Sequence, residues 1–120
     1  MGKTQLEQCV FDLSNMVIRW YKRQTKDGRD FGKNSLYSQF LRATTSIGAN
    51  LAESKGARPD ADYRSKISIA LNEANEALYW LELLAYNEEI NADESKEMEG
   101  LVRSAIGMLA STRKKLDERR

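Results

Sequence analysis

Residues 42–53 read Arg42-Ala43-Thr44-Thr45-Ser46-Ile47-Gly48-Ala49-Asn50-Leu51-Ala52-Glu53, a helical pattern built mostly from small side chains. Residues spaced by three and four positions share one face of a helix, and here they are Phe40, Ala43, Ile47, Asn50 and Ser54. A second line, of small residues at four-residue steps, consists of Thr44, Gly48 and Ala52. This second line predicts that another backbone packs closely against the helix.

A polar line runs between these two faces and consists of Arg42, Ser46, Asn50 and Glu53. A buried polar group without its hydrogen-bond partner costs about 1–3 kcal/mol. We therefore expect these side chains to find partners. Glu73 and Glu76, three residues apart on a later helix, complete a predicted structural polar network.

Three further helical patterns flank this segment. A capping-box pattern, Thr4-x-x-Glu7, predicts a first helix over about 5–25, because each side chain can bond the other residue's backbone N–H. The helix that contains Arg42 is expected over about 35–55, and the next over about 61–87. The sequence Asn91-Ala92-Asp93-Glu94 has the same capping pattern, with Asn91 three residues before Glu94, and it predicts the start of a fourth helix.

Four long helical patterns with short links, and no strand pattern, predict an all-α fold. The expected architecture is a single domain over residues 1–120, an antiparallel up-down-up-down four-helix bundle. Gly100 and Gly107 lie within the fourth helix, where each weakens a helix by about 1 kcal/mol relative to alanine. We expect both glycines at positions where a neighbouring helix packs closely.

Composition narrows the functional classes. The chain has 41% hydrophobic and 31% charged residues, which is typical of a compact helical protein rather than a disordered one. No apolar run approaches the roughly 18 residues that a membrane span needs, and the first residues lack the apolar core of a signal peptide. Cys9 is the single cysteine, so no intrachain disulfide is possible. The expected location is the cytoplasm.

The chain contains no histidine. This removes the usual general base, the histidine-activated nucleophiles and most zinc sites. One group of residues still permits chemistry: Glu53, Glu73 and Glu76 would form a carboxylate metal site or an acid–base pair if they gather in space. The alternative is a salt-bridge network with Arg42, with amide bonds from Asn50 and Asn72. We favour the network, and expect a non-enzymatic protein with no cofactor and no metal.

Two basic segments stand out. One closes the first helix and consists of Arg19, Lys22, Arg23, Lys26 and, just beyond, Arg29; the other closes the fourth and consists of Arg113, Lys114, Lys115, Arg119 and Arg120. We expect both to share one end of the bundle. Either they complement the helix dipoles, at about 0.3–1 kcal/mol per charge, or they bind the phosphates of a nucleic acid.

The aromatic residues predict self-association. Tyr79, Trp80 and Leu81 project in three directions from one helix, because successive residues are about 100° apart. With Phe11, Ile18 and Tyr86 they offer more apolar surface than one small bundle is expected to bury.

Two linked segments resemble a known family. The first is Ser38-Gln39-Phe40-Leu41 followed by residues 42–53; the second comprises Ala61-Asp62-Tyr63, residues 66–76 and Tyr79-Trp80-Leu81-Glu82-Leu83-Leu84. Both resemble the bacterial four helix bundle protein family, which includes proteins encoded by intervening sequences within large-subunit ribosomal RNA genes. The similarity is close over about 38–84, and the first and fourth helices match in pattern only.

The resemblance implies a ring-like homopentamer that is related to the accessory variability proteins of diversity-generating retroelements. Those proteins are basic pentameric bundles that bind nucleic acid and associate with a reverse transcriptase; the net charge of +1 departs from them. The leading hypothesis is therefore a nucleic-acid-binding or ribonucleoprotein accessory factor, with RNA or DNA and a reverse transcriptase as expected partners. The alternative is a protein-interaction scaffold that does not bind nucleic acid directly.

Overall fold

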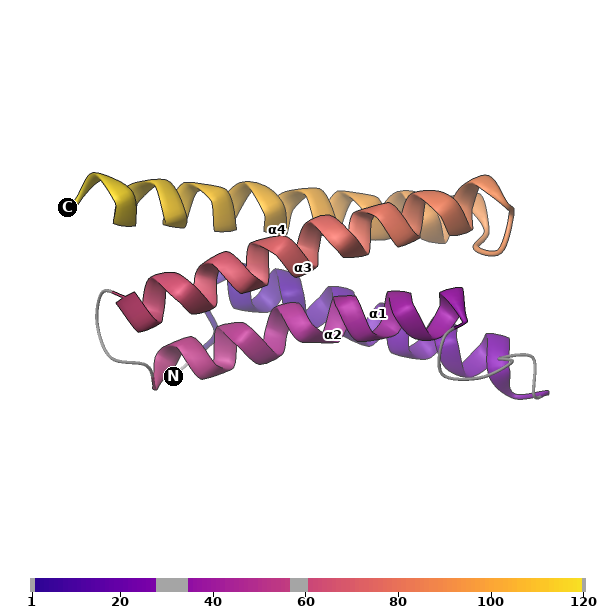
Figure 1. The fold of residues 1–120 in the computed structure, drawn as a ribbon. Coiled ribbons are helices and arrows are strands. Elements are labelled where there is room, and N and C mark those ends of the chain that lie inside the picture. Colours follow the sequence, from indigo (N-terminus) through magenta and orange to yellow (C-terminus); the bar gives the residue numbers. More distant parts are fainter. Residues whose placement is uncertain (1, 28–34, 57–60, 120) are drawn as a thin grey trace.

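The computed structural model describes residues 2–27, 35–56 and 61–119, and it contains four α-helices (Figure 1). They are α1 (Gln5–Thr25), α2 (Leu36–Lys55), α3 (Ala61–Tyr86) and α4 (Ala92–Glu118). The described residues form no β-strand. The all-α prediction is confirmed, and the predicted helix bounds agree with these to within a residue or two.

Side-chain caps explain where three of the helices begin. Thr4 caps α1 through the predicted capping box: Glu7 N–H donates to Thr4 Oγ1 at 3.1 Å, and Thr4 N–H donates to Glu7 Oε1 at 2.9 Å. Ser35 caps α2 by accepting from the Ser38 N–H at 3.2 Å, and Asn91 caps α4 by accepting from the Glu94 N–H at 2.8 Å. Each cap satisfies a backbone donor that the helix itself leaves unpaired.

Ion pairs show which helix ends lie together. Lys55 at the end of α2 binds Glu7 at the start of α1, with 2.6 Å between Nζ and Oε2. Arg64 near the start of α3 binds Asp117 near the end of α4, with 2.6 Å between Nε and Oδ1. At the other end of the molecule, Arg23 of α1 pairs with Glu94 of α4. The start of α1 and the end of α4 therefore lie at the same end (Figure 1).

The core lies along the axis shared by the four helices. Trp20 of α1 is fully buried and makes edge-to-face contacts with Tyr37 and Phe40 of α2, at ring-centroid distances of 5.1 and 5.7 Å. Alanines fill the buried faces of α2 and α3, and they are Ala43, Ala70, Ala74 and Ala77. These small side chains let α2 and α3 pack closely.

The glycines follow the prediction only in part. A Cβ at Gly48 would lie 3.4 Å from Val10 Cγ1, so a side chain of α1, rather than its backbone, packs against α2 at this position. The expectation for Gly100 and Gly107 is wrong: a Cβ at either position would meet nothing within 4 Å. Both glycines lie on the exposed face of α4 rather than on its buried seam.

None of the helices, over the residues described, is both long and apolar enough to span a membrane.

Candidate nucleic-acid interface

The predicted polar network divides into separate contacts. Arg42 binds Glu73, with 3.4 Å between Nη1 and Oε1, and it also pairs with Glu76. The indole N–H of Trp80 donates to Glu76 Oε1 at 3.1 Å. Arg42 therefore joins α2 to α3 on the outer surface, where two carboxylates neutralise its charge.

The other members of the network lie apart from this cluster. Glu53 binds Lys66, with 2.6 Å between Oε1 and Nζ. The sequence predicts that the Asn50 amide joins the salt-bridge network. Instead, its Nδ2 donates to the backbone carbonyl of Ser46 at 2.8 Å. No three potential metal ligands of the described residues gather into one site, so Glu53, Glu73 and Glu76 form no carboxylate cluster there.

The two basic segments lie at opposite ends of the bundle, so the prediction that they share one end is wrong. Arg23 near the end of α1 lies against the start of α4, whereas the end of α4 lies against the start of α3. The physical reason is direction: α1 and α4 run in opposite senses, so their last turns are separated by the length of the molecule (Figure 1).

The segment that closes α1 lies among acidic side chains. Its Arg23 pairs with Glu94, and the connection from α3 to α4 adds further carboxylates. We call this the mixed end, defined by residues 19–27, 35–38 and 84–97. Its described residues carry five basic and six acidic side chains. The predicted contacts Arg19, Lys22, Arg23 and Lys26 therefore do not form a positive surface by themselves.

The opposite end is clearly positive. We call it the basic end and define it by residues 2–7, 53–56, 61–66 and 113–119. Its described residues carry eight basic and five acidic side chains. Half of these cations were missed by sequence reasoning, and they are Lys3, Lys55, Arg64 and Lys66. The antiparallel direction of neighbouring helices is the signal that would have placed them there.

Three of the five described acidic side chains of the basic end form ion pairs with cations of α2 or α3. Lys55, Arg64 and Lys66 each hold a carboxylate at 2.6 Å. The end of α4 carries four described cations: Arg113, Lys114, Lys115 and Arg119. Unlike the cations of α2 and α3, none of these four forms an ion pair within the described part of the chain. Arg113 is half-buried and the other three are exposed. Arg120 and Arg29 lie outside the described residues.

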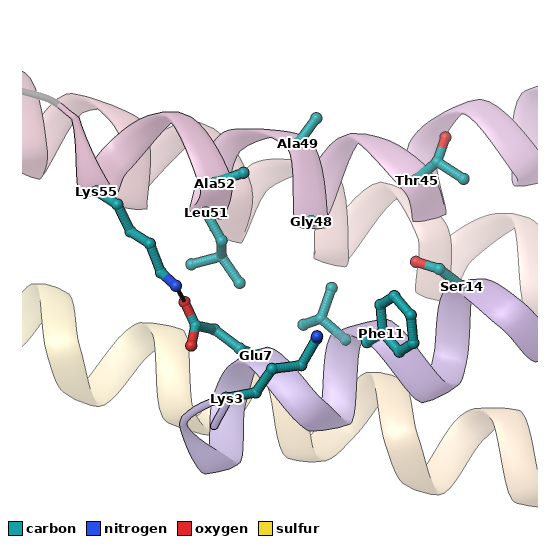
Figure 2. Close-up of a pocket in the computed structure, with 11 residues that line it drawn as sticks. Lys3, Glu7, Phe11, Ser14, Thr45, Gly48, Ala49, Leu51, Ala52 and Lys55 are labelled. Carbon is teal, nitrogen blue, oxygen red and sulfur yellow. Dashed lines mark ion pairs between the residues drawn. The ribbon is translucent and has the colours of Figure 1, made fainter. Parts of the chain in front are cut away.

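A groove opens beside the basic end, between α1 and α2 (Figure 2). Its volume is about 330 Å³, and its walls are mostly small or apolar: Phe11 and Val10 from α1 face Gly48 and Ala52 of α2. Small side chains on α2 leave this space open, because they cannot fill the gap between the two helix backbones.

Charged groups border the groove at the end that lies beside the start of α1. Lys3 Nζ lies 4.4 Å from the centroid of the Phe11 ring, a cation–π contact. The Lys55–Glu7 ion pair crosses the same end (Figure 2). The pKa of the Glu7 carboxyl lies below its ordinary value, chiefly because Lys55 donates to it and further because the Thr4 N–H does.

Comparison with solved structures agrees with this architecture. The chain is 32% identical to a Bacteroides thetaiotaomicron protein of unknown function from the S23 ribosomal protein family, whose crystal structure superposes with a TM-score of 0.83. The match covers 91% of this chain and 98% of that one. No curated protein matches the chain.

Comparison with family models gives the same assignment. The model for 23S rRNA-intervening sequence proteins matches residues 4–111, which include all four helices except the last turns of α4. This confirms the family that residues 38–84 indicate. The chain belongs to the 23S rRNA-intervening sequence protein family.

Proposed function

We propose that this protein is a non-enzymatic accessory factor that binds the phosphate backbone of RNA or DNA through its basic end, as part of a ribonucleoprotein. The observation that carries the proposal is a set of exposed cations at the end of α4, for which the described residues supply no ion-pair partner: Lys114, Lys115 and Arg119. Cations without carboxylate partners remain free to replace the counterions of a polyanion. The family's link to ribosomal RNA genes supports RNA as the first ligand to test.

This binding would be independent of base sequence. Lysine and arginine side chains that contact phosphates fix position and supply affinity, but they carry no sequence information. Among the described residues that define the basic end, no large aromatic residue is exposed; the exposed Phe11 ring lies beside that end, in the groove, with Lys3 Nζ 4.4 Å from its centroid. The affinity is therefore electrostatic and falls steeply as salt rises.

The proposal includes assembly. Four helices in an up-down-up-down bundle form the subunit, and five copies form a ring, as the family resemblance implies. A ring with its axis along the bundles would repeat the basic end around one face. Several weak phosphate contacts on one face then act together, which raises the avidity for a long polyanion.

The expected protein partner is a reverse transcriptase, and the expected location is the cytoplasm. An exposed aromatic surface on α3 favours a second candidate function, a protein-interaction scaffold without nucleic-acid binding. Tyr79 is 55% exposed and Tyr86 is 87% exposed, and aromatic side chains are favoured at protein interfaces.

Size exclusion with light scattering distinguishes the two functions. The purified protein is mixed with a structured RNA at low salt and compared with each component alone. A pentamer-sized complex that contains RNA supports the accessory factor. A pentamer that elutes without RNA contradicts it and favours the scaffold, whose test is partner capture before and after Tyr79→Ala.

A further inference from the structure

The groove between α1 and α2 offers an exposed aromatic ring opposite a wall of small side chains. Phe11 of α1 is 50% exposed, although phenylalanine is mostly buried in folded proteins. The facing wall is formed by Gly48, Ala49 and Ala52, which leave the space beside the ring open (Figure 2). The volume of about 330 Å³ lies at the lower limit for ligand pockets, so the groove has room for one nucleobase.

The mouth of the groove is positively charged. It is lined by Lys3, Glu7 and Lys55, and Lys55 holds the Glu7 carboxylate at 2.6 Å. The Lys3 ammonium has no carboxylate partner among the described residues, and it lies 4.4 Å from the centroid of the Phe11 ring. A phosphate is a stronger partner for an ammonium than the face of a ring is, because both groups then carry a full charge. An anion at the mouth therefore attracts Lys3.

The position of Lys3 beside Phe11 fits a bound nucleotide. Proteins that bind single-stranded nucleic acid combine cations that follow the phosphates with aromatic side chains on which bases stack. Phe11 keeps half of its surface exposed while Lys3 contacts the ring. Lys3 precedes α1 and its side chain is exposed, so its ammonium can move from the ring to a phosphate. That movement uncovers more of the ring for a base.

The groove is continuous with the basic end. Lys3 and Lys55 belong to both, and α1 packs against α2 as well as against α4. The start of α1 therefore lies between the mouth of the groove and the cations at the end of α4, among them Lys114 and Lys115. A phosphate backbone bound by those cations reaches the groove by crossing the start of α1. The bases of a duplex are held inside it, so only an unpaired nucleotide enters the groove.

We infer that the groove holds one unpaired nucleobase of a single-stranded RNA, stacked on Phe11, while the phosphate beside that base pairs with Lys3. This rests on the phosphate binding in the proposed function and names the class of RNA, a single strand or loop. Every base has an aromatic face, so the stacking adds affinity without reading the sequence. The cations of the basic end bind phosphates of any RNA, and the groove distinguishes unpaired from paired strands.

Two ligands of equal length test the stacked base. One is a short oligouridine, which stays unpaired, and the other is the same oligouridine annealed to oligoadenosine. Phe11→Ala is expected to weaken binding of the single strand about tenfold and to leave binding of the duplex unchanged. Because phenylalanine carries no charge, the slope of log K against log salt stays at the wild-type value in this variant.

Three further variants control for the shape of the groove and for exposed aromatic residues in general. Phe11→Trp keeps a ring for stacking and should retain the affinity for oligouridine. Ala52→Leu fills the groove from the facing wall and should cause a loss like that of Phe11→Ala. Tyr86→Ala removes an aromatic residue that is 87% exposed at the mixed end, and it should change nothing. Circular dichroism checks that each variant keeps its helices.

The Lys3 contact has a separate readout. Lys3→Gln should weaken binding of oligouridine and lower the salt slope by about 0.7, the value for one phosphate contact on a single strand. A wild-type slope in this variant would show that Lys3 does not contact a phosphate.

The outcomes separate this inference from the proposed function. A protein that binds neither ligand overturns the proposed function and the stacked base together. Binding of both ligands that is unaffected by Phe11→Ala keeps the proposed function and overturns the stacked base. Equal losses for the two ligands also overturn it, because they show a change in the fold or in the basic end. If decanoate binding depends on Phe11 and oligouridine binding does not, the groove holds an amphipathic anion instead.

Discussion

Arg23 near the end of α1 pairs with Glu94 in the first turn of α4, and this contact separates the two basic segments of the chain. It assigns the α1 segment to an end where carboxylates outnumber cations. The α4 segment lies at the other end, where its cations have no carboxylate partner within the described residues. Two segments of similar composition thus have different electrostatic environments, and only one of them suits a polyanion.

A stabilising substitution is available at Thr44. This side chain is fully buried, and its hydroxyl oxygen has no hydrogen-bond partner among the described residues. Thr44→Val keeps the branched shape and removes the unsatisfied group, so the free energy of unfolding should rise by about 1 kcal/mol. Urea unfolding followed by circular dichroism measures the change. A loss of stability would show that the hydroxyl has a partner, such as a buried water.

The turn after α3 offers a second stabilising site. Glu88 has a φ of 61°, in the left-handed region. The Glu89 N–H donates to Leu84 O at 2.9 Å and the Glu88 N–H donates to Ala85 O at 3.1 Å, the pattern of a Schellman cap in which glycine is preferred at the position of Glu88. Glu88→Gly should stabilise the fold by about 0.5–1 kcal/mol. Thermal melts compare it with Glu88→Ala, which keeps the strain and should give no such gain.

The Lys55–Glu7 pair should make stability depend on pH. The pKa of Glu7 is lowered from 4.5, first by the Lys55 hydrogen bond and then by the Thr4 N–H. A lowered folded-state pKa means that the ionised carboxylate stabilises the fold above the unfolded-state pKa. This stabilisation is lost as pH falls through the folded-state value.

Glu7→Gln should therefore melt below the wild type at pH 7, and the difference should shrink as pH falls below about 4.5. Glu118→Gln is the matched control, since Glu118 is exposed at the same end and forms no ion pair among the described residues. A difference for Glu7→Gln that stays constant down to pH 3 would show that the ion pair does not contribute.

The sequence predicts which face of each helix is buried better than it predicts which residues of two helices contact each other. The spacing of Phe40, Ala43 and Ile47 identifies a buried face, and all three are fully buried. The pairing of Glu53 with Lys66 was not predictable, because the register between α2 and α3 depends on a connection whose geometry one sequence does not give. The same holds for the groove: Gly48 signals a close approach, but not that Phe11 lies beside it.

The basic end shows the same limit. The segment Arg113-Lys114-Lys115 is obvious in the sequence, whereas Lys3 and Arg64 become part of that end only through the directions of the helices. Gly100 was misassigned because a glycine within a helix indicates close packing only when it lies on the buried face.

The most direct test of phosphate binding at the basic end is a pair of matched charge reversals, measured as RNA affinity over a range of salt concentrations. The first variant changes Lys114, Lys115 and Arg119 to Glu. The control changes Arg19, Lys22 and Lys26 to Glu, which are likewise three exposed cations in or beside the last turns of a helix.

If the basic end binds phosphates, the first variant loses affinity and its slope of log K against log salt becomes shallower by about two, at roughly 0.7 per lost phosphate contact on single-stranded RNA. The control should keep the wild-type slope. Equal losses in both variants, or a wild-type slope in the first, would contradict binding at the basic end.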